Sequence, residues 1–388
     1  NRVVYHTMTH NVPAAGTPGW TFNAGTHMNT NLTWWDMSGH LHTYLARCSA
    51  LLQAGQFVAD AVFYYGHEIP EFTKPKHVRP TLGPGYDYDD LNTEVLLTAD
   101  VEDGRVVLPG GMSYAVLVLP DEERMDVAVA RKIRDLLHKG ATVIGPKPGR
   151  VYGLENYRQQ EAGLRALADE LWGKGNRKKR DRRLGEGRLI SGVSVREVLQ
   201  DQNIGPDVEL FGAEIPTVDY IHRRTAGEEI YFFRNADSTA VSFEARLRVS
   251  GKQPFFWDAV TGERSRCAAF VREPGGIRLP LTLEAHGSMF VILTGTPQPH
   301  ISRIQHDGAV IFPAENQADR IRFQVVGDGE QVHFSAKPGA YQLTWNDGRT
   351  ETVTIESGQS LSIPGPWTVH FPPPWGAPAQ QTFDSLHS

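Results

Sequence analysis

The sequence begins Asn1-Arg-Val-Val-Tyr-His-Thr-Met-Thr-His10, and this stretch decides which fold the chain predicts. Residues 1–6 include apolar and β-branched residues and contain no breaker, which predicts a short buried strand. Side chains two apart share one face of a strand, so His6 and His10 are expected to point the same way. A loop of more than twenty residues rich in Asn, Thr, Gly, Pro and Trp follows His10. A strand that ends in polar residues before a long loop is typical of an α/β enzyme site.

A helix is predicted from Trp34 to Gln53, because apolar residues recur there at spacings of three and four. Thr33 fits an N-cap and Gly55 fits a C-cap. One strand and one helix make a single βα unit, which is too small to fold alone. We therefore interpret residues 1–54 as the last strand, loop and helix of a catalytic (α/β)8 barrel.

Residues 55–205 alternate apolar runs with amphipathic patterns, which predicts a doubly wound α/β domain. The expected strands are 57–65, 114–120, 140–146 and 187–191, and the expected helices are 126–139 and 154–172. This domain has no phosphate-cradling glycine loop and no nucleophile elbow. We expect a glutaminase-like fold without a nucleophile, serving a structural or docking role.

Two charged stretches of this region have competing interpretations. The basic run 174–183 predicts a solvated loop, with nucleic-acid binding as the minor alternative. The acids Asp87, Asp89 and Asp90 predict the N-cap and first turn of a helix that begins near Asp90. A cation site or a general acid/base pair is the alternative for these three carboxylates.

From about residue 206 the pattern changes to a period of two residues. Short strands at regular spacing predict a β-sandwich over 206–296, and a second β domain is expected over 297–388. Asn346-Asp-Gly348 is a hairpin turn signal in that second β domain. The chain starts inside a strand, shows no signal peptide and stops on a polar tail, so we expect a piece of a longer protein whose last β domain is truncated.

The bulk properties exclude several classes of partner. The net charge of −6 and pI near 6.2 give no reason to expect nucleic acid or an anionic membrane. No apolar run is long enough to span a bilayer. The two cysteines, Cys48 and Cys267, lack metal or redox spacing and are expected to be free and buried. The wealth of Trp, Gly and Pro is common among sugar-handling proteins.

The paired histidines allow three kinds of chemistry: they could ligate a metal, orient a carboxylate, or bond the hydroxyls of a ligand. No nearby Cys, Asp or Glu completes a metal shell, so we predict no metal site. Aromatic rings stack on the C–H face of a sugar while imidazoles bond its hydroxyls, and we therefore expect sugar binding. The alternative is that the histidines and tryptophans only pack the strand and the first helical turn. The candidate substrate-binding residues are His6, His10, His27, Trp20, Trp34 and Trp35.

The catalytic groups of a glycosidase are not found in this stretch. A glycosidase needs two carboxylates across its substrate, and the first fifty residues hold the single acid Asp36.

Several motifs occur in one order along nearly the whole chain: 2–10, Pro18-Gly-Trp-Thr21, Thr33-Trp-Trp35, 44–60, Pro84-Gly-Tyr-Asp-Tyr-Asp89, 108–114, 140–148, Trp257-Asp258 and Gly365-Pro-Trp367. Together they resemble bacterial α-L-rhamnosidases of glycoside hydrolase family 106. The resemblance implies a large secreted or periplasmic enzyme that releases terminal α-L-rhamnose from polysaccharides or glycans with inversion. It also implies that His6, His10 and His27 line the sugar pocket.

The resemblance further implies paired catalytic glutamates upstream of Asn1, so the catalytic residues of this chain are unknown. It implies calcium as a cofactor, for which no clear ligand set is seen, and a carbohydrate as partner, with a homo-oligomer allowed. One alternative is another barrel glycosidase of the β-galactosidase type. The other is a non-catalytic carbohydrate-binding or assembly module that uses Trp345, Trp367 or Trp375.

Overall fold

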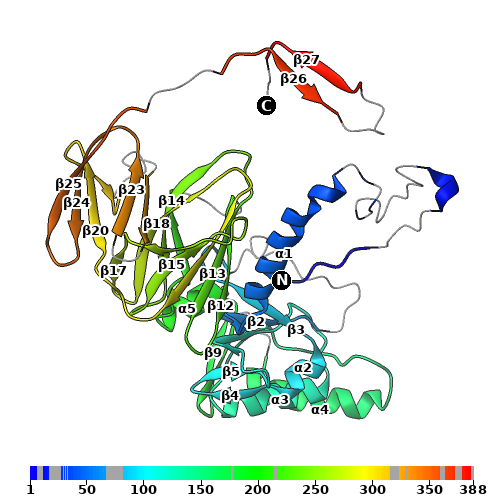
Figure 1. Ribbon diagram of the computed structural model, residues 1–388. Coiled ribbons are helices and arrows are strands. Elements are labelled where there is room, and N and C mark those ends of the chain that lie inside the picture. The colour runs from blue at the N-terminus through cyan, green and yellow to red at the C-terminus, as the bar shows by residue number, and fades with distance from the viewer. Residues whose placement is uncertain are drawn as a thin grey trace.

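The computed structural model describes residues 1–6, 12–16, 28, 30, 32, 34–66, 82–175, 179–212, 217–314, 323–328, 331–358, 363–371 and 378–385. The protein is a mixed α/β chain in which all described helices lie before residue 202 and the described strands continue to residue 383 (Figure 1). None of the described helices is both long and apolar enough to cross a membrane.

Residues 1–6 are not the buried strand that the sequence predicts. They have no regular structure, and Val3, Val4 and Tyr5 are 50%, 88% and 46% exposed. A buried parallel strand needs neighbours that pair with its amides and cover its side chains, and no strand in the described part of the chain does so. The segment instead runs beside helix α1, where the Gln53 side chain donates to the carbonyl of Asn1 at 3.0 Å. The placement of this unit in a barrel stays a prediction.

Helix α1 (Ser38–Gln53) follows the short helices η1 (Pro13–Ala15) and η2 (Trp35–Met37), which confirms most of the predicted helix. Met37 occupies the N-cap, while the expected cap Thr33 lies outside the described residues. Gly55, just beyond the helix, has a φ of +57°, and a Cβ there would lie 2.1 Å from the carbonyl oxygen of Arg224. Only glycine therefore fits this turn.

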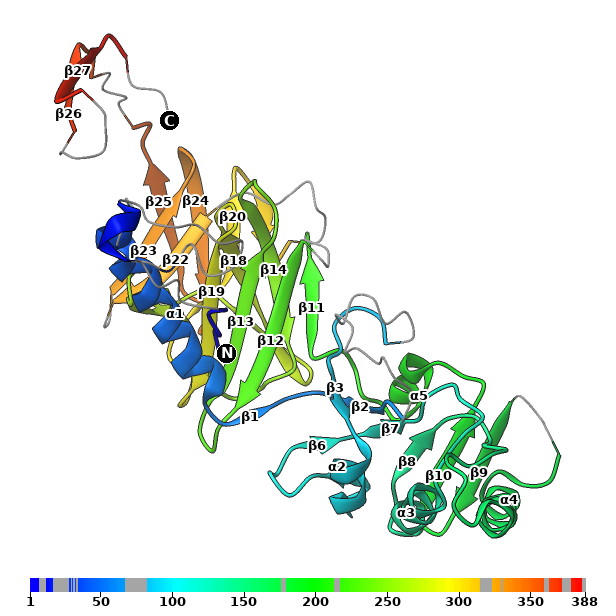
Figure 2. The same cartoon turned by 90° about the vertical axis from the view of Figure 1, so that its right-hand side faces the viewer.

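The α/β sheet has the strand order β3-β2-β7-β8-β10-β9, and all strands but β9 run parallel. Alternate residues of its strands pack against helices on both faces (Figure 2), as the doubly wound pattern predicts. Helices α2, α3 and α4 cover one face and α5 covers the other. The strands are β2 (Ala61–Tyr64), β3 (Tyr88–Leu91), β7 (Val116–Val118), β8 (Thr142–Ile144), β9 (Arg180–Leu184) and β10 (Gly187–Ser191). The helices are α2 (Thr93–Thr98), α3 (Val127–His138), α4 (Tyr157–Trp172) and α5 (Val195–Asp201).

Two charged stretches of this region differ from their predicted structure. Residues 180–183, the end of the basic run, belong to strand β9, which pairs with β10. Arg182 donates to the carbonyls of Glu170 and Leu171 at 2.9 and 2.7 Å and so caps the C-terminal end of α4. Asp89 and Asp90 lie in strand β3, not in a helix. The following helix α2 starts at Thr93, with the Asn92 side chain accepting from the amide of Val95 at 2.9 Å.

The β region contains two sheets that enclose a common core, which confirms the period-two strands of the sequence. The larger sheet has the order β1-β12-β13-β19-β15-β16-β22-β23, and the smaller has the order β11-β14-β18-β17. The larger sheet comprises β1 (Gln56–Phe57), β12 (Val218–Arg224), β13 (Glu229–Asn235), β15 (Gln253–Trp257), β16 (Arg264–Cys267), β19 (Ser288–Thr294), β22 (Phe323–Asp328) and β23 (Gln331–Ala336). The smaller comprises β11 (Val208–Phe211), β14 (Val241–Leu247), β17 (Val271–Glu273) and β18 (Gly276–Leu283).

Three small sheets complete the described structure. They are β4 (Asp100–Glu102), β5 (Arg105–Val107) and β6 (Ser113–Tyr114); β20 (Ile301–His306), β21 (Ala309–Phe312), β24 (Gly339–Trp345) and β25 (Thr350–Ile355); and β26 (Trp367–His370) with β27 (Gln380–Phe383). The expected turn joins β24 to β25, where the amide of Gly348 donates to the carbonyl of Trp345 at 3.0 Å.

The larger β sheet crosses two of the predicted domain boundaries. Strand β1 precedes the α/β sheet in the chain but pairs with β12, and β22 lies beyond residue 297 but pairs with β16. The boundaries at 54/55, 205/206 and 296/297 stay predictions. Both cysteines are free and buried, as expected, and burial raises the pKa of the Cys267 thiol to about 12.

Candidate active-site wall and the cavity of the α/β sheet

Three aromatic side chains meet where the N-terminal segment lies beside α1. The ring centroids of Tyr5 and His42 are 6.3 Å apart and those of Trp35 and His42 are 5.9 Å apart, and both pairs are arranged edge to face. A hydrogen bond of 3.4 Å joins the Tyr5 hydroxyl to Nδ1 of His42. We call Tyr5, Trp35 and His42 the aromatic cluster. It offers ring faces, an imidazole and a hydroxyl at a partly exposed surface.

The continuous helical run from η2 into α1 explains why the side chains of Trp35 and His42 meet. Residues seven apart lie on one face of a helix, two turns from each other. His42 was missed by the sequence interpretation, although its spacing from Trp35 could have found it. Tyr5 was missed because its approach to α1 depends on the irregular course of residues 1–6.

Contacts with the larger β sheet hold α1 in place. Cys48 and Leu52 pack against Ile230 and Phe290 of that sheet. Nη1 of Arg47 donates to the carbonyls of Ala259 and Val260 at 3.0 and 2.7 Å, and the hydroxyls of Tyr44 and Ser288 are 2.8 Å apart. The β region therefore positions α1, the helix that carries His42 of the aromatic cluster.

The predicted sugar-binding residues are only partly placed by the structure. His6 is exposed and adjoins Tyr5, and Trp34 and Trp35 are half-buried with their rings 6.4 Å apart. Neither tryptophan belongs to the core cluster beneath α1. His10, His27 and Trp20 lie outside the described residues, so the pairing of His6 with His10 stays a prediction.

Calcium, which the family resemblance implies, finds no fitting donor set in the part of the chain that the structure describes. No three His, Cys, Asp or Glu side chains gather there. Asp89, one of the clustered acids, accepts a hydrogen bond of 2.7 Å from the Tyr114 hydroxyl. The described residues thus offer no converging set of hard oxygen ligands of the kind that calcium prefers.

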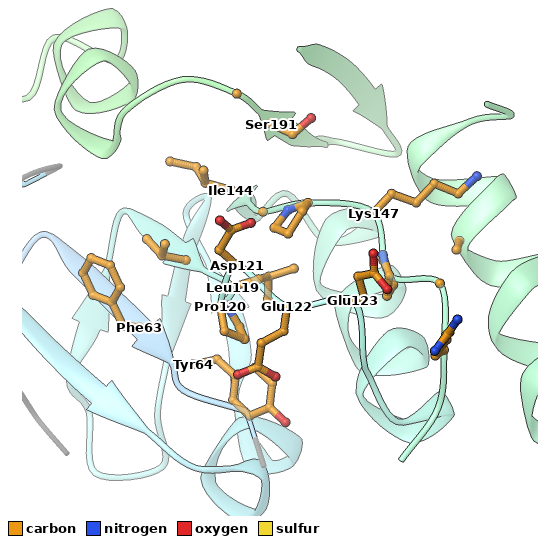
Figure 3. Close-up of a pocket in the computed structure, with 18 of the residues that line it drawn as sticks. Phe63, Tyr64, Leu119, Pro120, Asp121, Glu122, Glu123, Ile144, Lys147 and Ser191 are labelled. Carbon is orange, nitrogen blue, oxygen red and sulfur yellow. The ribbon is translucent and has the colours of Figure 1, made fainter. Parts of the chain in front are cut away.

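Apart from the aromatic cluster, a concave feature lies at the carboxyl ends of the parallel strands β2, β7, β8 and β10. It is a cavity of about 1460 Å³ (Figure 3). The acidic run 121–123 enters it from the loop after β7, Lys147 enters from the loop after β8, and Ser191 stands at the end of β10. Ligands of open α/β sheets bind at this edge. The residues that line the cavity include Ser191 and Lys147 but no cysteine and no histidine.

The family of the chain follows from its sequence pattern. The pattern of the alpha-L-rhamnosidase family, glycoside hydrolase family 106, matches residues 1–270. The chain belongs to this family. The matched residues of this family-106 chain include the aromatic cluster, the lining of the cavity and strands β11 to β16 of the β region.

A rhamnosidase from Novosphingobium sp. PP1Y has a similar structure, with a TM-score of 0.71 and 26% sequence identity. The match covers 98% of this family-106 chain and 32% of that chain. A Formosa agariphila protein named "Putative beta-glucuronidase" is 32% identical over 295 residues, which are 75% of this chain and 24% of that protein. The chain therefore spans only about a quarter to a third of these two relatives.

The β-galactosidase alternative receives no support from structure. A β-galactosidase from Bacillus circulans sp. alkalophilus matches with a TM-score of 0.41 at 11% identity, over 69% of this chain and 46% of that one. A likeness this weak carries no argument about function.

Proposed function

We propose that this chain is part of an enzyme that hydrolyses terminal α-L-rhamnose from polysaccharides or glycans. The observation that carries the proposal is the family-106 match over residues 1–270, and the rhamnosidase structure that covers 98% of the chain supports it. The enzyme acts on carbohydrate outside the cytoplasm, secreted or periplasmic. The same proposal allows a homo-oligomer.

The aromatic cluster forms one wall of the sugar site. Trp35 presents a ring face for the C–H groups of the sugar, while the imidazole of His42 and the hydroxyl of Tyr5 bond its hydroxyls. His6 adjoins this wall, and His10, His27, Trp20 and Trp34 remain proposed contacts. These groups orient the sugar, and none of them is a carboxylate.

The proposed chemistry is inverting hydrolysis. A carboxylic acid protonates the leaving oxygen while a carboxylate on the opposite face activates water. Asp36 is the single acid of the first fifty residues, and it is exposed at η2. We therefore propose that the acid and base come from parts of the enzyme other than this chain.

Activity of the whole natural enzyme on a panel of aryl glycosides tests the proposal. We expect turnover of p-nitrophenyl α-L-rhamnoside, with NMR showing the opposite anomer released first. Turnover of the β-galactoside alone would support the barrel-glycosidase alternative, and turnover of the β-glucuronide alone would favour the activity that the Formosa agariphila relative is named for. Either result would contradict the rhamnosidase proposal.

A further inference from the structure

We propose that the cavity at the carboxyl edge of the α/β sheet is a second, non-catalytic binding site for a neutral oligosaccharide. That the oligosaccharide contains rhamnose rests on the proposed function, whereas the neutral polyhydroxyl class rests on the cavity itself. The cavity lies among β2, β7, β8 and β10, while the aromatic cluster lies on the N-terminal segment, η2 and α1. The two sites therefore involve different residues and can be tested separately.

One end of the cavity holds a carboxylate that is already oriented. The Tyr152 hydroxyl donates to Oε2 of Glu122. Gly66, at the end of β2, leaves room for that carboxylate, because a Cβ there would come within 2.9 Å of Oε2. An oriented carboxylate makes strong charge-assisted hydrogen bonds with donors such as sugar hydroxyls.

Two of the three cations that line the cavity, Lys147 and Arg165, are already paired with carboxylates. Lys147 Nζ lies 2.5 Å from Oδ1 of Asp169 and donates to the carbonyl of Gly173 at 2.9 Å. Arg165 pairs with Glu161 at 2.6 Å. These cations can donate to a neutral hydroxyl oxygen, but they have little charge left with which to hold an anion.

The balance of charge selects the ligand class. The acidic run 121–123 and Asp169 stand against Lys147, Arg150 and Arg165 among the lining residues. Phosphate sites need an excess of cations or backbone amides, and a uronate would meet like charge on Glu122. A divalent cation has no set of three donors among the described residues. A neutral ligand with many hydroxyls meets none of these objections.

The remaining lining offers apolar surface to such a ligand. Tyr65, Pro120, Pro146 and Pro148 border the cavity. Sugars present C–H faces to apolar surfaces of this kind, and rhamnose adds a methyl group. The volume of about 1460 Å³ is larger than most small-molecule sites, which fits an oligosaccharide better than one sugar. When one part of a glycan is bound in this cavity, the effective concentration of the rest of that glycan near the enzyme rises.

Calorimetric titration of the 388-residue chain with a neutral tetrasaccharide of α-linked L-rhamnose tests the proposal. Glu122→Gln should weaken binding about tenfold, as loss of a charge-assisted hydrogen bond does. Gly149→Trp should abolish binding, because Gly149 lines the cavity and a Cβ there meets no atom within 4 Å. Matched controls are Glu351→Gln on exposed β25 and Gly227→Trp, whose Cβ also meets nothing within 4 Å. Both controls should bind as the unchanged chain does.

Three results would overturn the proposal: no binding to the unchanged chain, unaltered binding by folded Gly149→Trp, or loss of binding on Trp35→Ala alone. Equal binding of a tetrasaccharide that contains glucuronate would overturn the neutral class. Thermal unfolding confirms that each variant is folded, and Tyr152→Phe replaces Glu122→Gln if that variant unfolds. If a neutral galactose tetrasaccharide binds with the same dependence on Glu122 while the whole enzyme hydrolyses no aryl rhamnoside, the cavity site stands and the proposed function fails.

Discussion

The imidazole of His222 lies between two carboxylates, with Nδ1 3.0 Å from Oδ2 of Asp207 and Nε2 2.9 Å from Oε2 of Glu229. The residue is fully buried, and the ring of Tyr231 stacks on it at 3.9 Å. Both ring nitrogens face acceptors, so both carry a proton and the ring is an imidazolium. Burial opposes this charge, but the two carboxylates, led by Asp207, raise the pKa of His222 above its ordinary range.

The same group of charges joins the α/β sheet to the β region. Nη2 of Arg248 lies 2.8 Å from Oδ1 of Asp60, just before β2, and 3.7 Å from Oδ1 of Asp207. Arg224 and Lys252 reach Glu229 from the other side at 2.8 and 3.3 Å. Each of these buried charges thus has a partner of opposite sign. Removing one partner leaves the other charge buried and unpaired, which destabilises the fold.

Stability should fall as the pH rises above neutrality. The pKa of His222 is raised above 6.5 in the folded chain, so its stabilisation is complete below pH 6.5 and is lost as the pH rises through the folded-state value. The pKa of Glu229 is lowered to about 2, because hydrogen bonds from His222 and Arg224 outweigh burial, so its stabilisation is present above 4.5 and is lost as the pH falls towards 2.

Urea unfolding from pH 6 to 9 measures the effect, and His222→Gln is the informative variant. It should lower the free energy of unfolding by about 3–5 kcal/mol at pH 6, because two buried carboxylates lose their partner. It should also flatten the alkaline slope. An equal slope in both proteins would show that other groups facing this network, such as Asp60 or Tyr231, cause it.

Arg248→Met should destabilise the chain by about 3–5 kcal/mol, because Asp60 and Asp207 would remain buried without their shared cation. Arg349→Met is the matched control, since Arg349 pairs with Asp347 at 2.7 Å on the surface and should contribute about 0–1 kcal/mol. Urea unfolding at pH 7 compares the two variants. Similar losses for both would contradict the assignment of the buried network as a structural joint.

Gly55→Ala should lower the free energy of unfolding by about 2–4 kcal/mol. The added Cβ is strained in the left-handed backbone conformation of this residue, and it collides with the Arg224 carbonyl. Gly275→Ala has a similar φ of +72° but no atom within 4 Å of the new Cβ, so it should cost only about 1–2 kcal/mol. Thermal and urea unfolding compare the two. The excess loss at Gly55 measures the close approach between the end of α1 and β12.

Trp35→Ala in the whole enzyme should lower kcat/KM on an aryl α-L-rhamnoside about tenfold, as loss of a positioned contact to the transition state does. Leu41→Ala is the control, because Leu41 is 43% exposed on the adjoining helix α1 and lies outside the aromatic cluster. Unchanged kinetics for Trp35→Ala, with a folded protein, would remove the cluster from the sugar site.

Local pattern predicted most elements of this chain. Helix α3 ends within a residue of the helix that apolar spacing predicts at 126–139, and the period-two strands from residue 218 onward are present. Gly55 was predicted at the end of α1 from its type alone, and it takes the left-handed conformation. Periodicity and caps act between neighbours in sequence, so the sequence displays them directly.

The errors arose where structure depends on distant residues. Residues 1–6 have the composition of a strand, but a strand forms only where another strand accepts its backbone. The basic run was assigned to a loop because of its charge, although part of it pairs with β10 as strand β9. Asp90 was assigned to a helix, although it lies in β3 and pairs with β2. Each prediction had the right local chemistry and the wrong neighbour.

The sequence by itself determined the family, the helices and strands with strong periodicity, and the absence of any cysteine between residues 49 and 266. Only the tertiary structure decided that Tyr5 meets His42, that Asp60 and Arg248 pair across 188 positions, and that four loops enclose a cavity. The physical reason is that charge pairing, burial and concave shape depend on distances in space. Those distances exist only once the sheets have paired and packed.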